Sequence, residues 1–167
     1  LDAARRAKDV RENLAAAHKI LEMTRSKKMI AAVNFQLRYA PFIMEARNMI
    51  EANQLGKIND IEININVHTP WQLWDFLYTS PRVEILYHSI HYVDLIRSFL
   101  GNPASVYAKT TGHPAMRELA SVRSNIIMDY GDMVRANILT NHCHLYGSQK
   151  QQSYIKFEGS KGAIRIT

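Results

Sequence analysis

The sequence has little cysteine and no long hydrophobic run. Its one cysteine, Cys143, has no partner for an internal disulfide, and the alternating residues around it are typical of a small buried side chain on a strand. We therefore expect a reducing, cytoplasmic setting. No apolar stretch approaches the roughly 20 residues that cross a bilayer, and no signal peptide pattern is present. We expect no membrane partner.

Positive charge exceeds negative charge, but it is not clustered as nucleic-acid recognition requires. The net charge is +6 at pH 7, and many of the cations lie between residues 5 and 28. The arginine and aromatic clusters of an RNA-binding sheet are missing. A solvated helix face explains this distribution, and the alternative is a basic rim that attracts an anionic substrate or the phosphates of a dinucleotide. We expect no nucleic acid partner.

The N-terminal residues 1–36 have the pattern of half an α/β unit. Apolar residues recur every three or four positions over residues 2–26, which predicts a helix with one buried face. The continuous apolar run over 29–35 predicts a strand that is covered on both sides, as in a parallel sheet. The first residue is Leu1 rather than Met, so we expect a longer protein in which these residues end a truncated Rossmann domain.

Residues 37–167 have the pattern of an α+β domain. Helices are predicted over 41–55 and 85–100, and an ordered loop over 69–84. Alternating apolar and polar residues predict strands at 57–68, 105–111, 124–130, 134–143, 153–158 and 163–167. The last strand has no cap, so we expect the domain to continue. The predicted fold class is α+β, with an open, mostly antiparallel sheet and helices on one face, preceded by the Rossmann remnant.

Proton-exchanging side chains gather at the start of the predicted 85–100 helix. Helical spacing places Tyr87, His91 and Asp94 on one face, with His88 beside them. Imidazole, whose reference pKa is about 6.5, both donates and accepts protons near neutrality. His91 is therefore the best general acid or base in the sequence. The alternative is that these residues are packed, hydrogen-bonded parts of the helix.

Four segments in order resemble one family of oxidoreductases. The run YHSIHYVDLIRSFLG at 87–101 is similar to a family helix with the pattern Asp-x-x-x-His-x-x-Asp and a closing Leu-Gly. The segments VNFQLRYAP at 33–41, NQLGKI at 53–58 and GSKGAI at 159–164 are similar as well. The chain thus resembles the Gfo/Idh/MocA oxidoreductases, the family of glucose-fructose oxidoreductase and inositol dehydrogenase.

This resemblance implies an NAD(P)-dependent oxidoreductase. In the family an N-terminal Rossmann domain binds the cofactor, the second domain holds a sugar or polyol against the nicotinamide, and a lysine and the histidine manage the hydroxyl proton. Neither that lysine nor a Gly-x-Gly-x-x-Gly loop is found in this sequence. By the resemblance, NAD or NADP is bound mainly by an absent N-terminal domain, and we predict that this chain alone is inactive.

The family's roles transfer to particular residues of the helix. His91 matches the catalytic histidine, and Tyr87 stands where the family usually has aspartate. Tyr87 would either bond the reacting hydroxyl or mark a different substrate. His88 and Asp94 are candidates for substrate binding, and the alternative for Asp94 is that it fixes the helix or a neighbouring side chain.

Further candidates lie outside that helix. Arg38 and Tyr39 resemble residues that line the cleft near the nicotinamide, and a structural ion pair is the alternative for Arg38. Trp71 and Trp74 form either an aromatic wall against a sugar or the packing of a long loop. His68, at the end of its predicted strand, is a candidate for substrate contact.

Metal binding is not expected from the histidine pattern. His142 and His144 share one face of a predicted strand, but no third and fourth ligand has suitable spacing.

An assembly is expected from the open sheet. Its uncovered face and edge need a partner, and the family commonly pairs such sheets between subunits, so we expect a homodimer or larger homo-oligomer. The alternative to an enzyme is a non-catalytic ligand sensor or scaffold protein of the same fold, in which Tyr87 marks lost catalysis.

Overall fold

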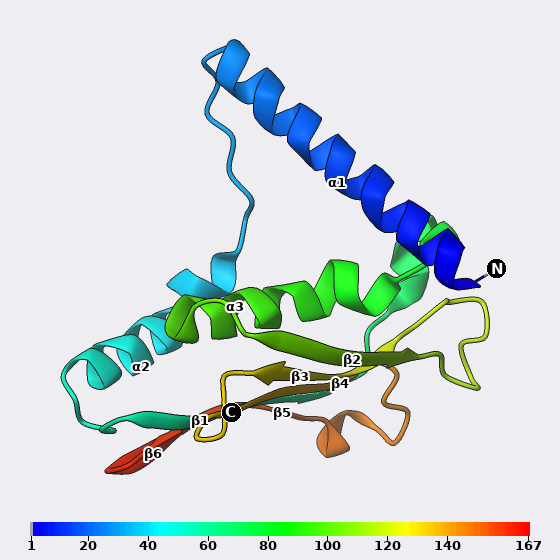
Figure 1. The fold of residues 1–167 in the computed structure, drawn as a ribbon. Coiled ribbons are helices and arrows are strands. Elements are labelled where there is room, and N and C mark those ends of the chain that lie inside the picture. The colour runs from blue at the N-terminus through cyan, green and yellow to red at the C-terminus, as the bar shows by residue number, and fades with distance from the viewer. Residues whose placement is uncertain (1) are drawn as a thin grey trace. The chain divides into compact units, whose positions relative to one another are not determined.

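The first unit of the chain is one helix followed by an extended segment. The computed structural model describes residues 2–167. The chain divides into a unit that ends at Asn34 and a second unit, Phe35–Thr167. Helix α1 spans Asp2–Ser26, as the sequence predicts (Figure 1).

Two predictions for this first unit are wrong. Residues 29–35 form no strand, and the side chain of Ile30 is fully exposed. A strand is stable only when its N–H and C=O groups pair with a neighbouring strand, and none of the described strands pairs with this segment. Leu14 and Leu21, which belong to the apolar stripe of α1, are exposed rather than buried.

Two helices of the second unit begin and end at residues that suit those places. Helix α2 spans Pro41–Glu51, with its proline in the first turn, where a missing N–H costs nothing. The predicted 85–100 helix is a π-helical turn, η4 (Ile85–Ser89), followed by helix α3 (Ile90–Leu100). Helix α3 ends at Gly101, whose φ of 77° is readily adopted only by glycine.

The connections contain short 3-10 turns. The segment predicted as an ordered loop over 69–84 holds two of them, and the others precede α2 and β5. They are η1 (Gln36–Tyr39), η2 (Trp71–Leu73), η3 (Asp75–Thr79) and η5 (Ser148–Lys150).

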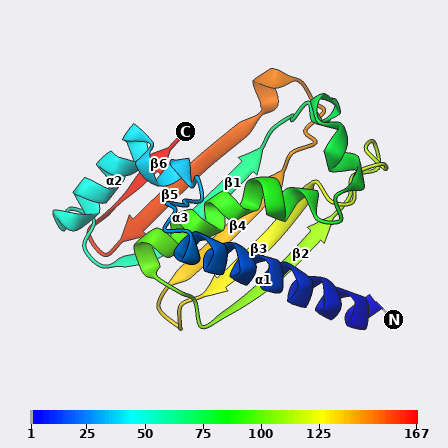
Figure 2. The same ribbon diagram turned by 90° about the horizontal axis from the view of Figure 1, so that it is seen from above.

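The sheet has six strands in the order β2-β3-β4-β1-β5-β6. The strands are β1 (Ile58–Asn66), β2 (Ser105–Thr111), β3 (Arg123–Asp129), β4 (Arg135–Asn141), β5 (Gln152–Gly159) and β6 (Gly162–Ile166). Only the central pair of β1 and β4 is parallel, and the other pairs are antiparallel. Helices α2 and α3 lie on one face of this open sheet (Figures 1 and 2). The predicted α+β fold class is therefore confirmed.

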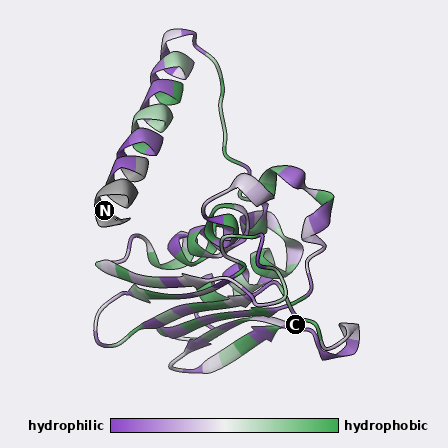
Figure 3. Cartoon of the chain, turned by 90° about the vertical axis from the view of Figure 1, so that its right-hand side faces the viewer, coloured by the Kyte–Doolittle hydropathy of each residue, from purple (hydrophilic) through white to green (hydrophobic). Residues whose placement is uncertain are grey.

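The hydrophobic core lies between these helices and the sheet. Ile61, Ile63 and Ile65 alternate along β1 with polar residues, and all three are buried in one cluster with Leu95 and Ile96 of α3. The bands of opposite hydropathy along the strands follow this alternation (Figure 3). Burying each such side chain contributes about 1.5–3 kcal/mol, so the helical face of the sheet holds the unit together.

Gly159 provides a test of backbone packing. A Cβ at this position would overlap the carbonyl oxygen of Leu55, whereas one at Gly162 would meet nothing. We expect Gly159→Ala to lower the free energy of unfolding by about 1–3 kcal/mol, measured by urea denaturation of the chain. The matched control, Gly162→Ala, should change it by no more than about 0.5 kcal/mol. Equal effects of the two substitutions would contradict the close approach.

Candidate functional site

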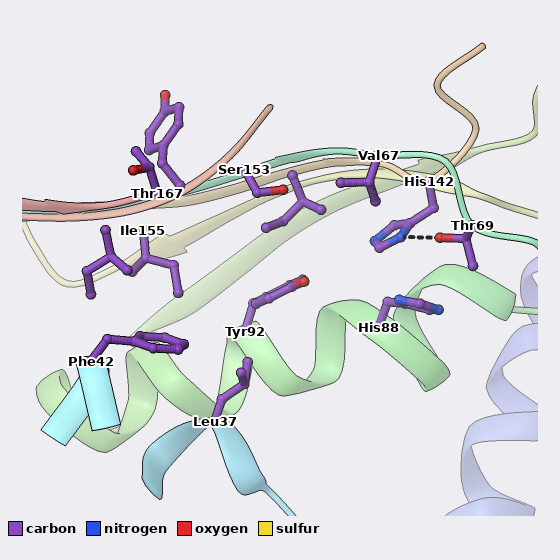
Figure 4. Close-up of a pocket in the computed structure, with 13 residues that line it drawn as sticks. Leu37, Phe42, Val67, Thr69, His88, Tyr92, His142, Ser153, Ile155 and Thr167 are labelled. Atoms are coloured by element: carbon purple, nitrogen blue, oxygen red, sulfur yellow. Dashed lines mark hydrogen bonds between the residues drawn. The ribbon is translucent and has the colours of Figure 1, made fainter. Parts of the chain in front are cut away.

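A cavity of about 520 Å³ lies between the helices and the inner face of the sheet. The end near Phe42 and Ile155 is mostly apolar, with Thr167 beside it, and the opposite end holds Thr69, His88 and His142 (Figure 4). Its apolar wall includes Leu37, Phe42, Ile65, Ile155 and Ile166. Its polar groups include Thr69, His88, Tyr92 and His142. A few hydrogen-bonding groups set against an apolar wall are the usual composition of a small-molecule site.

Two side chains of the helical segment formed by η4 and α3 face this cavity. His88 and Tyr92, four residues apart, line the cavity. Tyr87 is exposed and packs edge-on against Phe76, with ring centroids 5.6 Å apart. The structure therefore places Tyr87 away from the cavity.

His91 lies one turn from the cavity residues. Its ring packs edge-on against Phe35, with centroids 5.8 Å apart. Its Nδ1 is buried and has no hydrogen-bond partner among the described residues. Burial lowers the pKa of His88 to about 4, and the charge of His91 adds to this effect. His88 is therefore neutral at neutral pH, and His91 retains an unused ring nitrogen.

His142 is the best-fixed polar group of the cavity. It follows β4 directly, and its Nδ1 lies 3.0 Å from the Oγ1 of Thr69. Its backbone carbonyl accepts hydrogen bonds from the Thr69 N–H and the Trp71 Nε1–H. Burial, assisted by His88, lowers the pKa of His142 to about 3. The ring is therefore neutral and presents one fixed face to the cavity.

Trp71 supports the two histidines without lining the cavity. It is 1% exposed, and its ring packs edge-on against His88 and His142 at centroid distances of 4.9 Å and 6.0 Å. The rings of His88 and His142 are 4.1 Å apart. Trp71 thus packs within the loop and forms no wall of the cavity. Trp74 is exposed and lies outside the cavity lining as well.

Arg38 and Asp94 form a structural ion pair. The guanidinium of Arg38 donates from Nε and Nη2 to the two carboxylate oxygens of Asp94, at 2.6 Å and 2.5 Å. This pair joins η1 to α3 and lies outside the cavity lining. This geometry agrees with an ion pair for Arg38 and with Asp94 fixing a neighbouring side chain. Tyr39 and His68 are exposed and do not line the cavity either.

Sequence reasoning missed Glu84, which is fully buried behind the cavity. Its Oε1 accepts hydrogen bonds from Ser89 at 2.7 Å and Thr140 at 2.8 Å. Burial raises the pKa of Glu84 from 4.5 to about 7, although these two hydrogen bonds oppose the rise. The available signal was one acidic residue inside the apolar run Val83–Leu86. Thr69 and Tyr92 carried no such signal, and His142 was considered only as a metal ligand.

Within residues 2–167, no three His, Cys, Asp or Glu side chains are grouped so that they could hold a metal ion. In the same part of the chain, no helix combines the length and the apolar character needed to cross a membrane.

The fold is that of a known family of C-terminal domains. A family model described as the GFO/IDH/MocA C-terminal domain matches residues 43–165. This match includes most of the 167 residues, so the chain belongs to the GFO/IDH/MocA family. No curated protein matches the chain.

Several solved structures share the fold. An oxidoreductase from Agrobacterium radiobacter in complex with NAD+, L-tartaric acid and magnesium has a TM-score of 0.77 and 18% identity, over 92% of this chain and 45% of that one. An inositol dehydrogenase homolog from Azotobacter vinelandii, complexed with NADH and myo-inositol, has a TM-score of 0.74 and 16% identity, over 91% and 41%.

A third solved structure is scyllo-inositol dehydrogenase from Lactobacillus casei, with bound NAD(H) and scyllo-inositol. Its TM-score is 0.68 at 19% identity, over 90% of this chain and 46% of that one. At these identities the likeness establishes the fold alone. The chain spans less than half the length of each of the three structures.

The buried carboxyl group predicts a pH-dependent stability difference. Because the folded pKa of Glu84, about 7, lies above its usual 4.5, the ionised form costs stability above pH 7, and this cost vanishes below about pH 4.5. Glu84→Gln should therefore gain stability relative to the wild type as pH rises, by on the order of 3 kcal/mol between about pH 4 and pH 8.

Urea denaturation across this pH range measures the difference. Ionisable groups that do not contact Glu84 contribute equally in both proteins, so their contributions cancel in the comparison. The matched control is Glu118→Gln, in which an exposed carboxylate is replaced. A constant stability difference between Glu84→Gln and the wild type at all pH values would contradict the raised pKa.

Proposed function

We propose that this chain is the substrate-side domain of an NAD(P)-dependent oxidoreductase that transfers hydride between a nicotinamide cofactor and a sugar, polyol or related hydroxy compound. The cavity is the observation that carries the proposal. Its polar groups include those of Thr69, His88, Tyr92 and His142, and the end near Phe42 and Ile155 is mostly apolar. A cyclic polyol has hydroxyls around its rim and C–H groups on its faces, which suits both ends. The bound tartrate and inositols of the similar structures support the same class.

Within this proposal, His91 exchanges the proton of the reacting hydroxyl. Its buried Nδ1 without a partner supports that role, because a buried polar atom normally finds one. His88 contacts the substrate from the cavity side. Tyr87 either bonds the reacting hydroxyl or marks a different substrate, and its place outside the cavity lining favours the second role. Exposed Tyr39 is the remaining candidate for cofactor contact.

The dinucleotide itself does not fit the residues of this chain. The described residues include no glycine-rich turn at the start of a helix, and the first unit is a helix without glycine. Such a turn is what lets a backbone approach a pyrophosphate. We therefore propose that NAD or NADP is bound mainly by another domain of the full-length protein, and that this chain alone does not catalyse dehydrogenation.

The full-length protein provides the test of this function. With NAD+ or NADP+, we expect reduced-cofactor absorbance to appear with at least one member of a panel of inositols, aldoses and sugar acids. His91→Asn should lower kcat by about 100-fold or more, as expected for loss of a general acid or base. The 167-residue chain alone should give no signal. If the cofactor binds but absorbance never changes, the enzyme proposal fails and a ligand sensor is favoured.

The open face of the sheet is proposed to pair with a second copy of the chain. Tyr107, Ile127 and Leu139 are exposed on the face opposite the helices. Exposed apolar groups on a sheet are commonly covered by a partner. Light scattering should show a homodimer or larger assembly of the full-length protein. Ile127→Lys should shift it toward monomer, whereas Tyr146→Lys, in an exposed loop, should not. A strictly monomeric wild type would contradict the proposal.

A further inference from the structure

Two buried polar atoms face each other behind the cavity without a hydrogen bond. Oε2 of Glu84 and Nε2 of His142 are 3.6 Å apart, and neither has a partner among the described residues. Glu84 is 0% exposed and His142 is 3% exposed. Buried polar groups in folded proteins are normally paired. An unpaired carboxyl oxygen aimed at an unpaired ring nitrogen therefore calls for an explanation.

The other polar atoms of both groups are already satisfied. Oε1 of Glu84 accepts from two hydroxyl groups, and Nδ1 of His142 is bonded to Thr69 Oγ1 at 3.0 Å. No lysine or arginine of the described residues lies within 4.0 Å of the Glu84 carboxyl group to neutralise it. A small closing movement would let one proton bridge Oε2 and Nε2, which satisfies both atoms at once.

The position of that proton is coupled to Thr69. When Glu84 is protonated, it donates to Nε2 of His142, so Nδ1 carries the ring proton and donates to Thr69. When Glu84 is ionised, it accepts from Nε2–H, so Nδ1 becomes an acceptor and Thr69 donates to it. A neutral imidazole has only these two tautomers. Charge on the buried carboxyl group thus sets the direction of a hydrogen bond at the cavity wall.

We propose that Thr69, His142 and Glu84 form a proton relay that exchanges one proton between a hydroxyl group bound in the cavity and the buried carboxyl group. Both Thr69 and His142 line the cavity, and Glu84 lies behind them. That the bound hydroxyl belongs to a polyol substrate rests on the proposed function, and the relay would then take the proton that the family resemblance assigns to His91, which does not line the cavity. Glu84 acts through His142 and is therefore a positioning residue.

The relay balances in protons. The ligand O–H bond breaks and its proton passes to Thr69 Oγ1, while the electron pair stays on the ligand oxygen. The original Thr69 proton passes to Nδ1 of His142, and the Nε2 proton passes to the Glu84 carboxylate. Thr69 and His142 end as they began, apart from their orientation and tautomer. The net change is one proton moved from ligand to Glu84, and the reverse sequence returns it.

The ionisable groups around Glu84 keep one protonation state near neutral pH, so Glu84 is the group of the relay that changes charge. His88 faces His142 from η4, and its pKa, like that of His142, is held far below neutrality. Tyr92 faces Glu84 from α3, and burial together with that charge raises its pKa to about 12. Burial raises the pKa of the neighbouring Cys143 thiol. The pKa of Glu84, about 7, lies between the low values of the two histidines and the high value of Tyr92.

Spectroscopy of the 167-residue chain tests the coupling without any ligand. The infrared band of a protonated carboxyl group and the ¹⁵N shifts of the His142 ring are followed from about pH 5 to about pH 9. We expect the band to disappear as Nδ1 loses its proton, both near pH 7. Glu84→Gln should abolish both changes, and the exposed-site control Glu118→Gln should preserve them. Loss of the band without a tautomer change in His142, or a tautomer change that persists in Glu84→Gln, would overturn the relay.

Kinetics of the full-length protein test the connection to the ligand. We expect Glu84→Gln to lower kcat for alcohol oxidation by about 10- to 100-fold and to remove a pH dependence near 7. Thr69→Val should keep the infrared titration of Glu84 and lose the same kinetic dependence. An unchanged pH profile in Glu84→Gln would overturn the relay and leave the proposed function standing. If the wild type oxidises no substrate, the proposed function fails, and the spectroscopic experiment decides the relay alone.

Discussion

The attachment of the η4 turn to the sheet is the interaction on which the rest of the second unit depends. Apolar burial of α3 against β1 is non-directional, whereas a hydrogen bond requires a particular geometry. Glu84 and Ser89 bond the hydroxyl groups of Thr140 and Ser124 through a buried network. Because these bonds are directional, they fix the rotation and height of the helix, and with them the residues that face the cavity.

Much of the fold could be predicted because it depends on local patterns. The alternation along β1 gave the strand and its buried face, and the proline and glycine at the helix ends gave α2 and α3. The segment 29–35 failed because an apolar run shows only that a strand is possible, whereas a strand forms only beside a partner. The apolar stripe of α1 likewise shows only that one face of the helix could be buried, and burial needs a partner surface.

The candidate site was less predictable because it depends on which face of the helix meets the sheet and on a distant pairing. Helical spacing grouped Tyr87 with His91, but the neighbouring face, with His88 and Tyr92, lines the cavity. No local pattern could bring His142 to Thr69, 73 residues earlier. Only the parallel register of β1 and β4 places the ends of those strands together. His91 stays a prediction from the family resemblance.

The central position of β1 has a consequence for the growing polypeptide. Strands β2, β3 and β4 follow one another as an antiparallel meander, and β5 and β6 form a hairpin, so both groups pair between neighbours in the chain. Strand β1 is synthesised before all of them, yet its two partners are β4 and β5. On a ribosome, its row of isoleucines must therefore wait, uncovered, for about 70 to 100 residues of later chain. During that interval the middle of the future sheet is its most aggregation-prone segment.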